Sequence, residues 1–172
     1  MAKKQTARAR LYIGNDTVVD YDQADATVAA ALEAAHLAPA DEYLLVGEVE
    51  NAGNVGDTYG ITEGTAITDF RTVKAKTAAR GATQNLILFA DLADLGQTRL
   101  KAALASLSDY NFKIELADTP AGSEATPTTF YYAGLVTQAE IQLATIQDFV
   151  RRAVTIEINT PTIEIPADDG AP

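Results

Sequence analysis

The sequence predicts a mainly β protein: an antiparallel β-sandwich or barrel with one flanking α-helix and with extended terminal arms and an extended loop. Short apolar segments with alternating polarity recur along the 172 residues, separated by stretches rich in Gly, Pro, Asn and Asp. Turns join most of these segments directly, which favours antiparallel pairing over helical crossovers. A single segment, residues 94–107, carries a strong helical pattern.

The first elements differ in the strength of their patterns. Residues 11–14 predict a short strand, and the alanine-rich residues 24–38 have helical propensity up to Pro39. Residues 43–50 (YLLVGEVE) predict a strand. One face of this strand is expected to carry Tyr43, Leu45 and Val49, and the other face Glu48 and Glu50.

A glycine-rich region follows. Residues 51–64 contain four glycines and predict a long loop, and residues 65–76 predict a strand with a polar second half. Residues 78–82 predict a turn around Arg80 and Gly81, before an apolar strand at 84–90.

The helix at 94–107 begins at a residue suited to capping. Asp94 precedes it, and Gln97 lies three residues further on, as in a capping box. We expect Leu100, Leu104 and Leu107 to lie on one apolar face, with Ala103 between them.

The remaining pattern is β. Residues 110–116, 129–139 and 149–159 predict three strands, with a Pro- and Gly-containing loop at 118–127. The expected inward side chains are Tyr110, Phe112, Ile114 and Leu116 in the first of these strands and Val154, Ile156 and Ile158 in the last. Residues 160–172, with three prolines, predict a C-terminal arm.

Composition excludes several classes of protein. The chain has no cysteine, so disulfides and thiolate chemistry are absent, which suits assembly in a bacterial cytoplasm. No apolar run approaches the ~20 residues of a membrane helix, and the basic start lacks the apolar region of a signal peptide. We therefore expect a protein without a membrane partner.

Charge is distributed in blocks within a net charge of −11. Residues 1–10 carry four bases and no acid, whereas residues 11–70 carry twelve acids and no Lys or Arg. Such blocks suit contacts between copies of one chain, although a plain acidic surface is the alternative. The overall sign argues against wrapping DNA, because phosphate binding needs Lys and Arg.

No catalytic, cofactor or metal site is predicted. The only histidine, His36, has no evident partner, and nucleophile-elbow and phosphate-loop motifs are absent. Asp20, Asp22 and Asp25 lack the Gly and Glu that an EF-hand loop needs at its sixth and twelfth positions. Glu48 and Glu50 have the spacing of a glycosidase pair, but a hydrated strand face is the stronger interpretation.

An ordered series of segments carries a family resemblance. Residues 46–57 (VGEVENAGNVGD) precede a strand, the basic Arg80-Gly81 segment, an apolar strand, and a Gly-Gln dipeptide that opens the helix. The aromatic strand YNFKI and the segment AGLVT follow. Over roughly residues 43–160, this order resembles the tail tube proteins (major tail proteins) of siphophages and gene-transfer agents.

The resemblance implies a structural subunit and not an enzyme. Homohexameric rings would stack into a hollow tube with an acidic lumen that conducts DNA during ejection, without specific binding. The implied partners are other copies of the chain, the tape measure protein, the tail terminator and the distal tail or baseplate proteins. The implied location is the virion tail, after assembly in the host cytoplasm.

Within this interpretation the chain divides into a basic N-terminal arm (1–10), a tail-tube β domain (11–160) and a C-terminal arm (161–172). The candidates for lining the lumen are Glu48, Glu50, Asp69, Glu115 and Glu157. The candidates for contacts between rings are Lys3, Lys4, Arg8, Arg10, Gly53, Gly56, Asp57 and Gly60. The alternatives are a β-sandwich decoration or host-adhesion module, and a carbohydrate-active enzyme.

Overall fold

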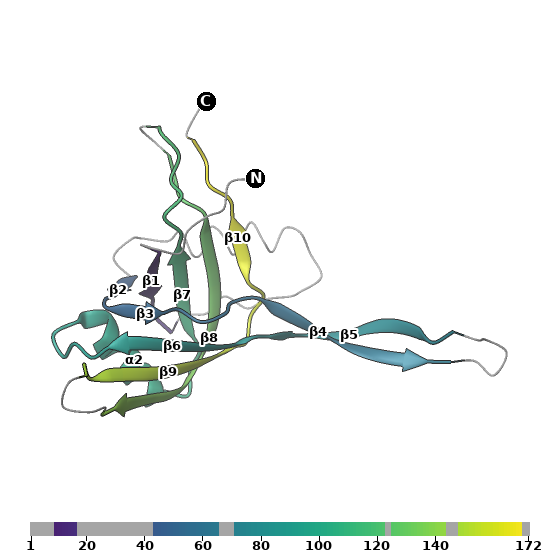
Figure 1. Cartoon of the computed structure of the whole chain (residues 1–172), viewed down its shortest axis with the longest axis horizontal. Helices are drawn as coiled ribbons and strands as arrows, with labels where there is room; N and C mark the ends of the chain where they lie inside the picture. Colours follow the sequence, from purple (N-terminus) through teal and green to yellow (C-terminus); the bar gives the residue numbers. More distant parts are fainter. Residues whose placement is uncertain (1–8, 17–42, 66–70, 123–124, 144–147, 170–172) are drawn as a thin grey trace.

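A computed structural model describes residues 9–16, 43–65, 71–122, 125–143 and 148–169 (Figure 1). Within these ranges it contains ten strands and one helix, which confirms the predicted mainly β fold with a flanking helix. The elements are β1 (Arg10–Ile13), β2 (Leu44–Val46), β3 (Val49–Asn51), β4 (Asp57–Gly64), β5 (Val73–Gly81), β6 (Thr83–Phe89), α2 (Leu95–Leu104), β7 (Tyr110–Glu115), β8 (Thr129–Gln142), β9 (Arg151–Ile158) and β10 (Ile163–Ile165). No helix in the described ranges is long and apolar enough to cross a membrane.

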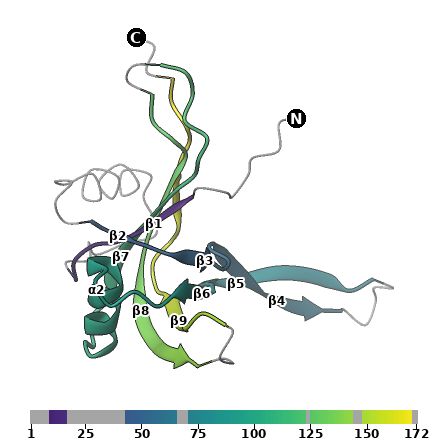
Figure 2. The ribbon, with the colours of Figure 1, turned by 60° about the vertical axis from the view of Figure 1, so that its left-hand side comes forward.

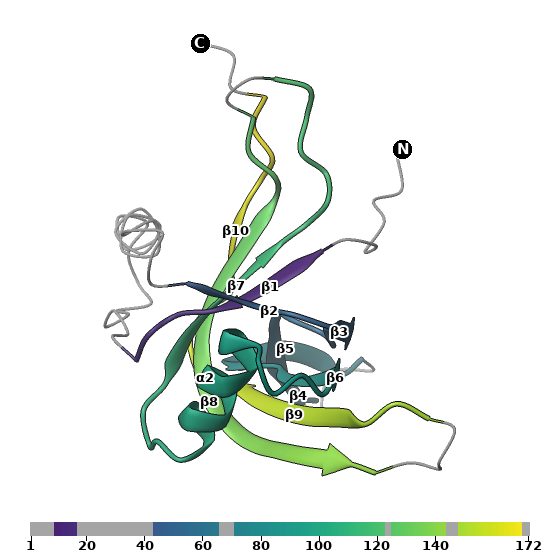
Figure 3. The ribbon, with the colours of Figure 1, turned by 90° about the vertical axis from the view of Figure 1, so that its left-hand side faces the viewer.

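One antiparallel sheet forms the body, in the order β2-β1-β7-β8-β9-β6-β3. The long strand β8 belongs to both halves of this sheet. Its residues Thr129 to Gly134 pair with β7, and residues Gly134 to Gln142 pair with β9. Figure 3 shows β8 curving from the upper half of the sheet into the lower half. The sheet therefore folds over at β8 into two layers.

The hydrophobic core lies between these two layers. Alternate side chains of β7, β8, β9 and β6 point into it, because successive residues of a strand face opposite sides. The buried apolar members include Leu11, Ile13, Phe112, Ile114 and Tyr132 from the upper layer and Leu86, Leu88, Val136, Val154, Ile156 and Ile158 from the lower layer. The inward faces predicted for β7 and β9 are confirmed.

The helix α2 closes one side of the core with Leu100 and Ala103, both buried. Its predicted apolar face is partly wrong: Leu104 is 39% exposed, and Leu107 lies beyond the helix and is 98% exposed. The capping box is also half formed. Asp94 accepts the Gln97 N–H, but the Gln97 side chain does not return to the Asp94 backbone.

The Gln97 amide instead joins three segments. Its Nε2 donates to the carbonyls of Gly47 (3.2 Å) and Phe89 (2.9 Å), and its Oε1 accepts the Asp91 N–H (3.2 Å). This fully buried amide thereby fixes the helix to the corner between β2 and β3 and to the end of β6.

The strand predicted at 43–50 is broken into β2 and β3. Glu48 has a φ of 58°, in the left-handed region that interrupts a strand. Before this break the register places Val46 in the core, whereas Leu45 is 48% exposed. The continuous alternation predicted over residues 43–50 is therefore interrupted at Glu48.

The region 51–81 differs most from the prediction. A second sheet, the hairpin of β4 and β5, occupies most of the expected loop 51–64. The expected turn at 78–82 is strand, because Arg80 and Gly81 pair with Thr58 and Asp57. Only Ala82 separates β5 from β6, so one extended backbone runs from the hairpin into the body (Figure 1). The middle of the strand predicted at 65–76 lies outside the described residues.

The ends of the chain are also more ordered than predicted. Arg10, assigned to the N-terminal arm, belongs to β1. In the C-terminal arm, β10 pairs with β8, and Asp168 forms a bridge with Thr126. The helix expected at 24–38, including His36, lies outside the described residues, as do Lys3, Lys4 and Arg8.

Candidate functional site

The second half of β8 presents an unpaired edge. Strand β7 pairs with β8 only as far as Gly134, whereas β9 pairs along the other edge to Gln142. Within the part of the chain that the structure describes, no strand pairs with the β7-side edge from Leu135 to Gln142. An open edge of this length is a template for pairing with another chain.

The outward face of the lower layer is largely polar. Cross-strand partners point to the same face, and the register produces rows across β6, β9 and β8. Each row has one residue from β6, one from β9 and one from β8. In order along β6, the outward rows are Thr83–Glu157–Leu135, Asn85–Thr155–Gln138, Ile87–Ala153–Glu140 and Phe89–Arg151–Gln142. The rows between them, such as Leu86, Val154 and Ala139, face the core. We call the outward face of these strands the polar face.

An ion pair crosses the polar face at one end. Arg151 on β9 donates through Nε to Glu50 on β3 at 2.7 Å, reaching over β6. The guanidinium also lies 5.3 Å from the centre of the Phe89 ring. The hydrogen bond and the charge of Glu50 raise the pKa of Arg151 above its ordinary value. Glu50 is therefore charge-compensated.

The other acids of the polar face are not compensated in this way. Glu157 accepts a hydrogen bond from the Thr83 hydroxyl at 2.8 Å, and Glu140 is exposed. Neither carboxylate forms a salt bridge with any residue that the structure describes. The polar face thus combines hydroxyl and amide groups with two uncompensated negative charges.

Glu115 lies on the outward face of the upper layer. There it forms a 2.8 Å salt bridge with Lys113 and accepts a hydrogen bond from the Tyr12 hydroxyl at 2.9 Å. Partial burial, followed by the hydrogen bond to Glu115, raises the pKa of Tyr12. Since the two layers pack core to core, Glu115 and Glu157 point to opposite sides of the molecule.

The structure thus places two of the predicted lumen residues, Glu50 and Glu157, on the polar face, at its opposite ends. It places Glu48 at the corner between β2 and β3, and Asp69 lies outside the described residues. Sequence reasoning missed Glu140 and Arg151. The alternation of Gln138, Glu140 and Gln142 was the available signal for Glu140, but the predicted strand ended at residue 139.

The glycine-rich candidates lie around the root of the hairpin. Gly53 has a φ of 68° and passes so close to the Asn85 backbone that a side chain would not fit. Gly56 and Asp57 begin the hairpin, and Gly60 lies opposite Thr77. Gly53 therefore has a structural role in seating the chain beside β6, whereas Gly56 directly precedes the hairpin and Asp57 and Gly60 belong to it.

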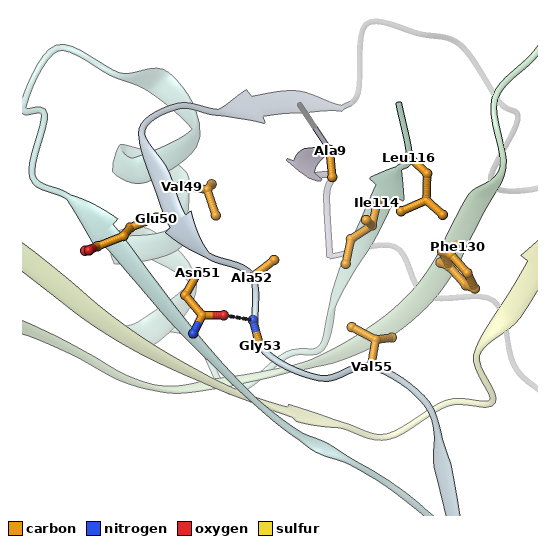
Figure 4. A pocket seen from close by; sticks show the side chains of 10 residues that line it. All are labelled: Ala9, Val49, Glu50, Asn51, Ala52, Gly53, Val55, Ile114, Leu116 and Phe130. Atoms are coloured by element: carbon orange, nitrogen blue, oxygen red, sulfur yellow. Dashed lines mark hydrogen bonds between the residues drawn. The ribbon is translucent and has the colours of Figure 1, made fainter. Parts of the chain in front are cut away.

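A cavity of about 330 Å³ opens between β3 and the start of β8. Figure 4 shows its apolar lining, with the Glu50 side chain turned away from it. The lining includes Val49, Val55, Ile114, Leu116 and Phe130. No group of His, Cys, Asp and Glu side chains suited to a metal occurs in the described ranges, and Asp20, Asp22 and Asp25 lie outside them.

Comparisons with known proteins show similarity in fold. No protein-family model and no curated protein sequence matches the chain. A chain of the anti-feeding prophage (AFP) baseplate has a TM-score of 0.67 and 9% identity, over 96% of this chain and 98% of that one. The SPP1 tail tube protein has a TM-score of 0.61 and 8% identity, over 95% and 80%.

A chain of the PVC sheath-tube complex, from an extracellular contractile injection system, is similar as well. Its TM-score is 0.60 with 12% identity, over 95% of this chain and 92% of that one. The chain therefore has the fold of tail tube and injection-system tube proteins. The narrower resemblance to siphophage and gene-transfer-agent proteins stays a prediction.

Proposed function

We propose that the chain is the subunit of a hollow phage tail tube, in which hexameric rings stack end to end. The observation that carries this proposal is the unpaired edge of β8, which borders the polar face. Pairing of this edge with the opposite side of the next copy continues the sheet from copy to copy. A closed ring leaves no edge unpaired, which removes the hazard that open edges present.

The polar face lines the lumen in this proposal. Glu140 and Glu157 supply its negative charge, whereas Glu50 is neutralised by Arg151. A wall with this charge repels phosphates, so that DNA passes without being held. Glu115 belongs to the layer that faces away from the lumen.

The hairpin of β4 and β5 is the proposed contact between copies. Strand β5 is exposed from Val73 to Arg80. The hairpin carries the exposed apolar side chains Tyr59 and Ile61 on β4 and Val73 on β5. A two-stranded hairpin without a packed face is marginally stable in water. Docking on another copy supplies the missing burial, and a head-to-tail contact of this kind generates a filament.

The remaining partners follow from the same role. The tape measure protein would occupy the lumen before DNA, and the tail terminator and distal tail or baseplate proteins would close the two ends of the tube. The location is the virion tail after assembly in the bacterial cytoplasm. None of these roles needs catalysis.

Electron microscopy of the concentrated protein, with and without tail initiator proteins, tests the proposal. We expect rings with six subunits and a central hole, and tubes built from them. Particles that remain single copies under both conditions contradict the proposal and favour the decoration or adhesion module.

A further inference from the structure

Two parts of opposite charge extend from the body in different directions (Figures 1 and 2). The hairpin arm, residues 57–65 and 71–81, carries the bases Arg71, Lys74, Lys76 and Arg80 and the acids Asp57 and Glu63. The acidic projection, residues 116–122, 125–128 and 159–169, carries the acids Asp118, Glu164, Asp168 and Asp169 and no base. The two parts are therefore electrostatically complementary.

One face of the hairpin arm combines apolar and basic groups. The register pairs Tyr59 with Ala79, Ile61 with Lys76 and Glu63 with Lys74, with a bulge between Tyr59 and Ile61. The Lys76 ammonium lies 4.7 Å from the centre of the Tyr59 ring, which confirms that both belong to this face. Ile61 is 64% exposed and stands beside these bases.

A groove of about 630 Å³ lies between β8, β10 and the bridge from Thr126 to Asp168. Its apolar surface comes from Pro127, Tyr131, Ile165, Pro166 and Ala167. Glu115 and Asp168 place carboxylates along it, and Lys113 is held by Glu115. The groove therefore offers an apolar floor within an acidic surrounding.

This groove matches the chemistry of the hairpin face. Tyr59 and Ile61 supply apolar surface for the floor, and Lys76 supplies charge opposite to that of the projection, whereas Lys74 is paired with Glu63 at 2.7 Å. The arm of the same copy does not fill the groove, since it leaves the body in another direction (Figures 1 and 2). The occupant is then the arm of a second copy.

We propose that the groove between β8 and β10 receives the Tyr59–Ile61–Lys76 face of the hairpin arm from a second copy of the chain. The inference rests on the proposed tube function and names the surface that accepts the arm. It assigns an acceptor role to the C-terminal segment 163–168, because Ile165 and Asp168 form one wall of the groove.

Engineered cysteines test this pairing, because the chain has none of its own. Subunits carrying Ile61→Cys are mixed with subunits carrying Ile165→Cys, assembled, and oxidised mildly. We expect a disulfide-linked pair on non-reducing gels from assembled material, and far less from the same mixture kept dilute. The matched control combines Ile61→Cys with Leu107→Cys, a 98% exposed position outside the groove.

The outcomes separate this inference from the function itself. If tubes form but residues 61 and 165 are not cross-linked, the proposed acceptor groove is wrong and the tube function stands. The same conclusion follows if residue 61 cross-links equally to residue 107. Absence of rings and tubes in the wild-type protein, together with absence of the link, overturns both.

A charge exchange provides a second measurement. Lys76→Glu places an acid against the acidic projection, and we expect it to raise the concentration needed for tube formation by about tenfold or more. Adding Asp168→Lys in the same chain should restore assembly. The docking is contradicted if Lys76→Glu does not alter assembly. It is also contradicted if the double variant fails to assemble although Asp168→Lys alone assembles normally.

Discussion

Individual buried polar side chains hold the layers of this fold in register. Gln97 joins α2 to two other segments, and the Tyr132 hydroxyl donates to Gln84 Oε1 at 2.6 Å inside the core. Gln84 in turn donates to the Ala52 carbonyl at 2.8 Å. Each of these groups satisfies buried partners that would otherwise lose hydrogen bonds on folding.

Replacing Gln97 with Leu tests the buried amide. The change leaves the Gly47 and Phe89 carbonyls and the Asp91 N–H without this partner, and we expect a loss of about 2–3 kcal/mol in the free energy of unfolding. Urea unfolding followed by circular dichroism measures it. Lys101→Leu, an exposed position on the same helix, is the control and should change stability by less than about 0.5 kcal/mol.

The phenol of Tyr132 makes stability dependent on alkaline pH. Burial raises the pKa of Tyr132 above its ordinary value of 10.0, so the folded state holds this proton more tightly than the unfolded state. The stabilisation is present below pH ~10 and is lost as the pH rises beyond that value. We expect the wild-type free energy of unfolding to decline above pH ~10.

Tyr132→Phe should lower stability at pH 7 by about 1–2 kcal/mol, because Gln84 Oε1 loses its donor. It should also make the decline above pH ~10 shallower. Unfolding measured at several pH values checks both effects, with Tyr59→Phe, an exposed ring, as the control at pH 7. An unchanged alkaline slope in Tyr132→Phe refutes the assignment.

At the scale of elements, α2 depends on close backbone contact with β2. A Cβ added at Gly96 would collide with the Leu45 carbonyl, which cannot move without disturbing the sheet. We expect Gly96→Ala to reduce stability by about 1–3 kcal/mol despite the helical preference of Ala. Gly64→Ala is the matched control, since nothing lies near its Cβ position.

Sequence patterns predicted the elements whose periodicity is local. The strands near 84–90, 110–116, 129–139 and 149–159 and the helix starting after Asp94 are all present. The capping residue and the inward faces of β7 and β9 were predictable, because alternation and capping are properties of neighbouring residues.

The misses arose where distant contacts decide the structure. The hairpin β4–β5 has no buried face, so its sequence carries little apolar alternation. The sequence predicted a loop over β4 and a turn over the end of β5, and only the start of β5 fell within a predicted strand, 65–76. Leu107 fitted the helical spacing, but the helix ends at Leu104. The polar face depends on registers among β6, β9 and β8, and no pattern within one strand shows that Arg151 reaches Glu50.

At the scale of the whole molecule, the polar face makes a prediction about DNA. Glu140→Lys combined with Glu157→Lys converts its two uncompensated acids into bases. We expect tubes of this variant to form yet to retain short DNA fragments that wild-type tubes release. Retention should weaken steeply as salt rises, because counterion release drives it.

Co-sedimentation of tubes with labelled DNA measures this retention. Asp91→Lys, an exposed acid in the loop before α2, is the control for added positive charge elsewhere. Equal retention by both variants would show that Glu140 and Glu157 do not face the passage.

The near-continuity of β5 and β6 has a mechanical consequence. Covalent backbone, interrupted as a strand only at Ala82, links the outer end of the hairpin to the row of Thr83 and Glu157. A force or torque applied to the described outer part of the hairpin is thus transmitted along extended backbone, which resists stretching far better than side-chain packing does. In the proposed tube, bending or torsion would accordingly be shared between successive rings as an elastic load, and need not open the joints between them.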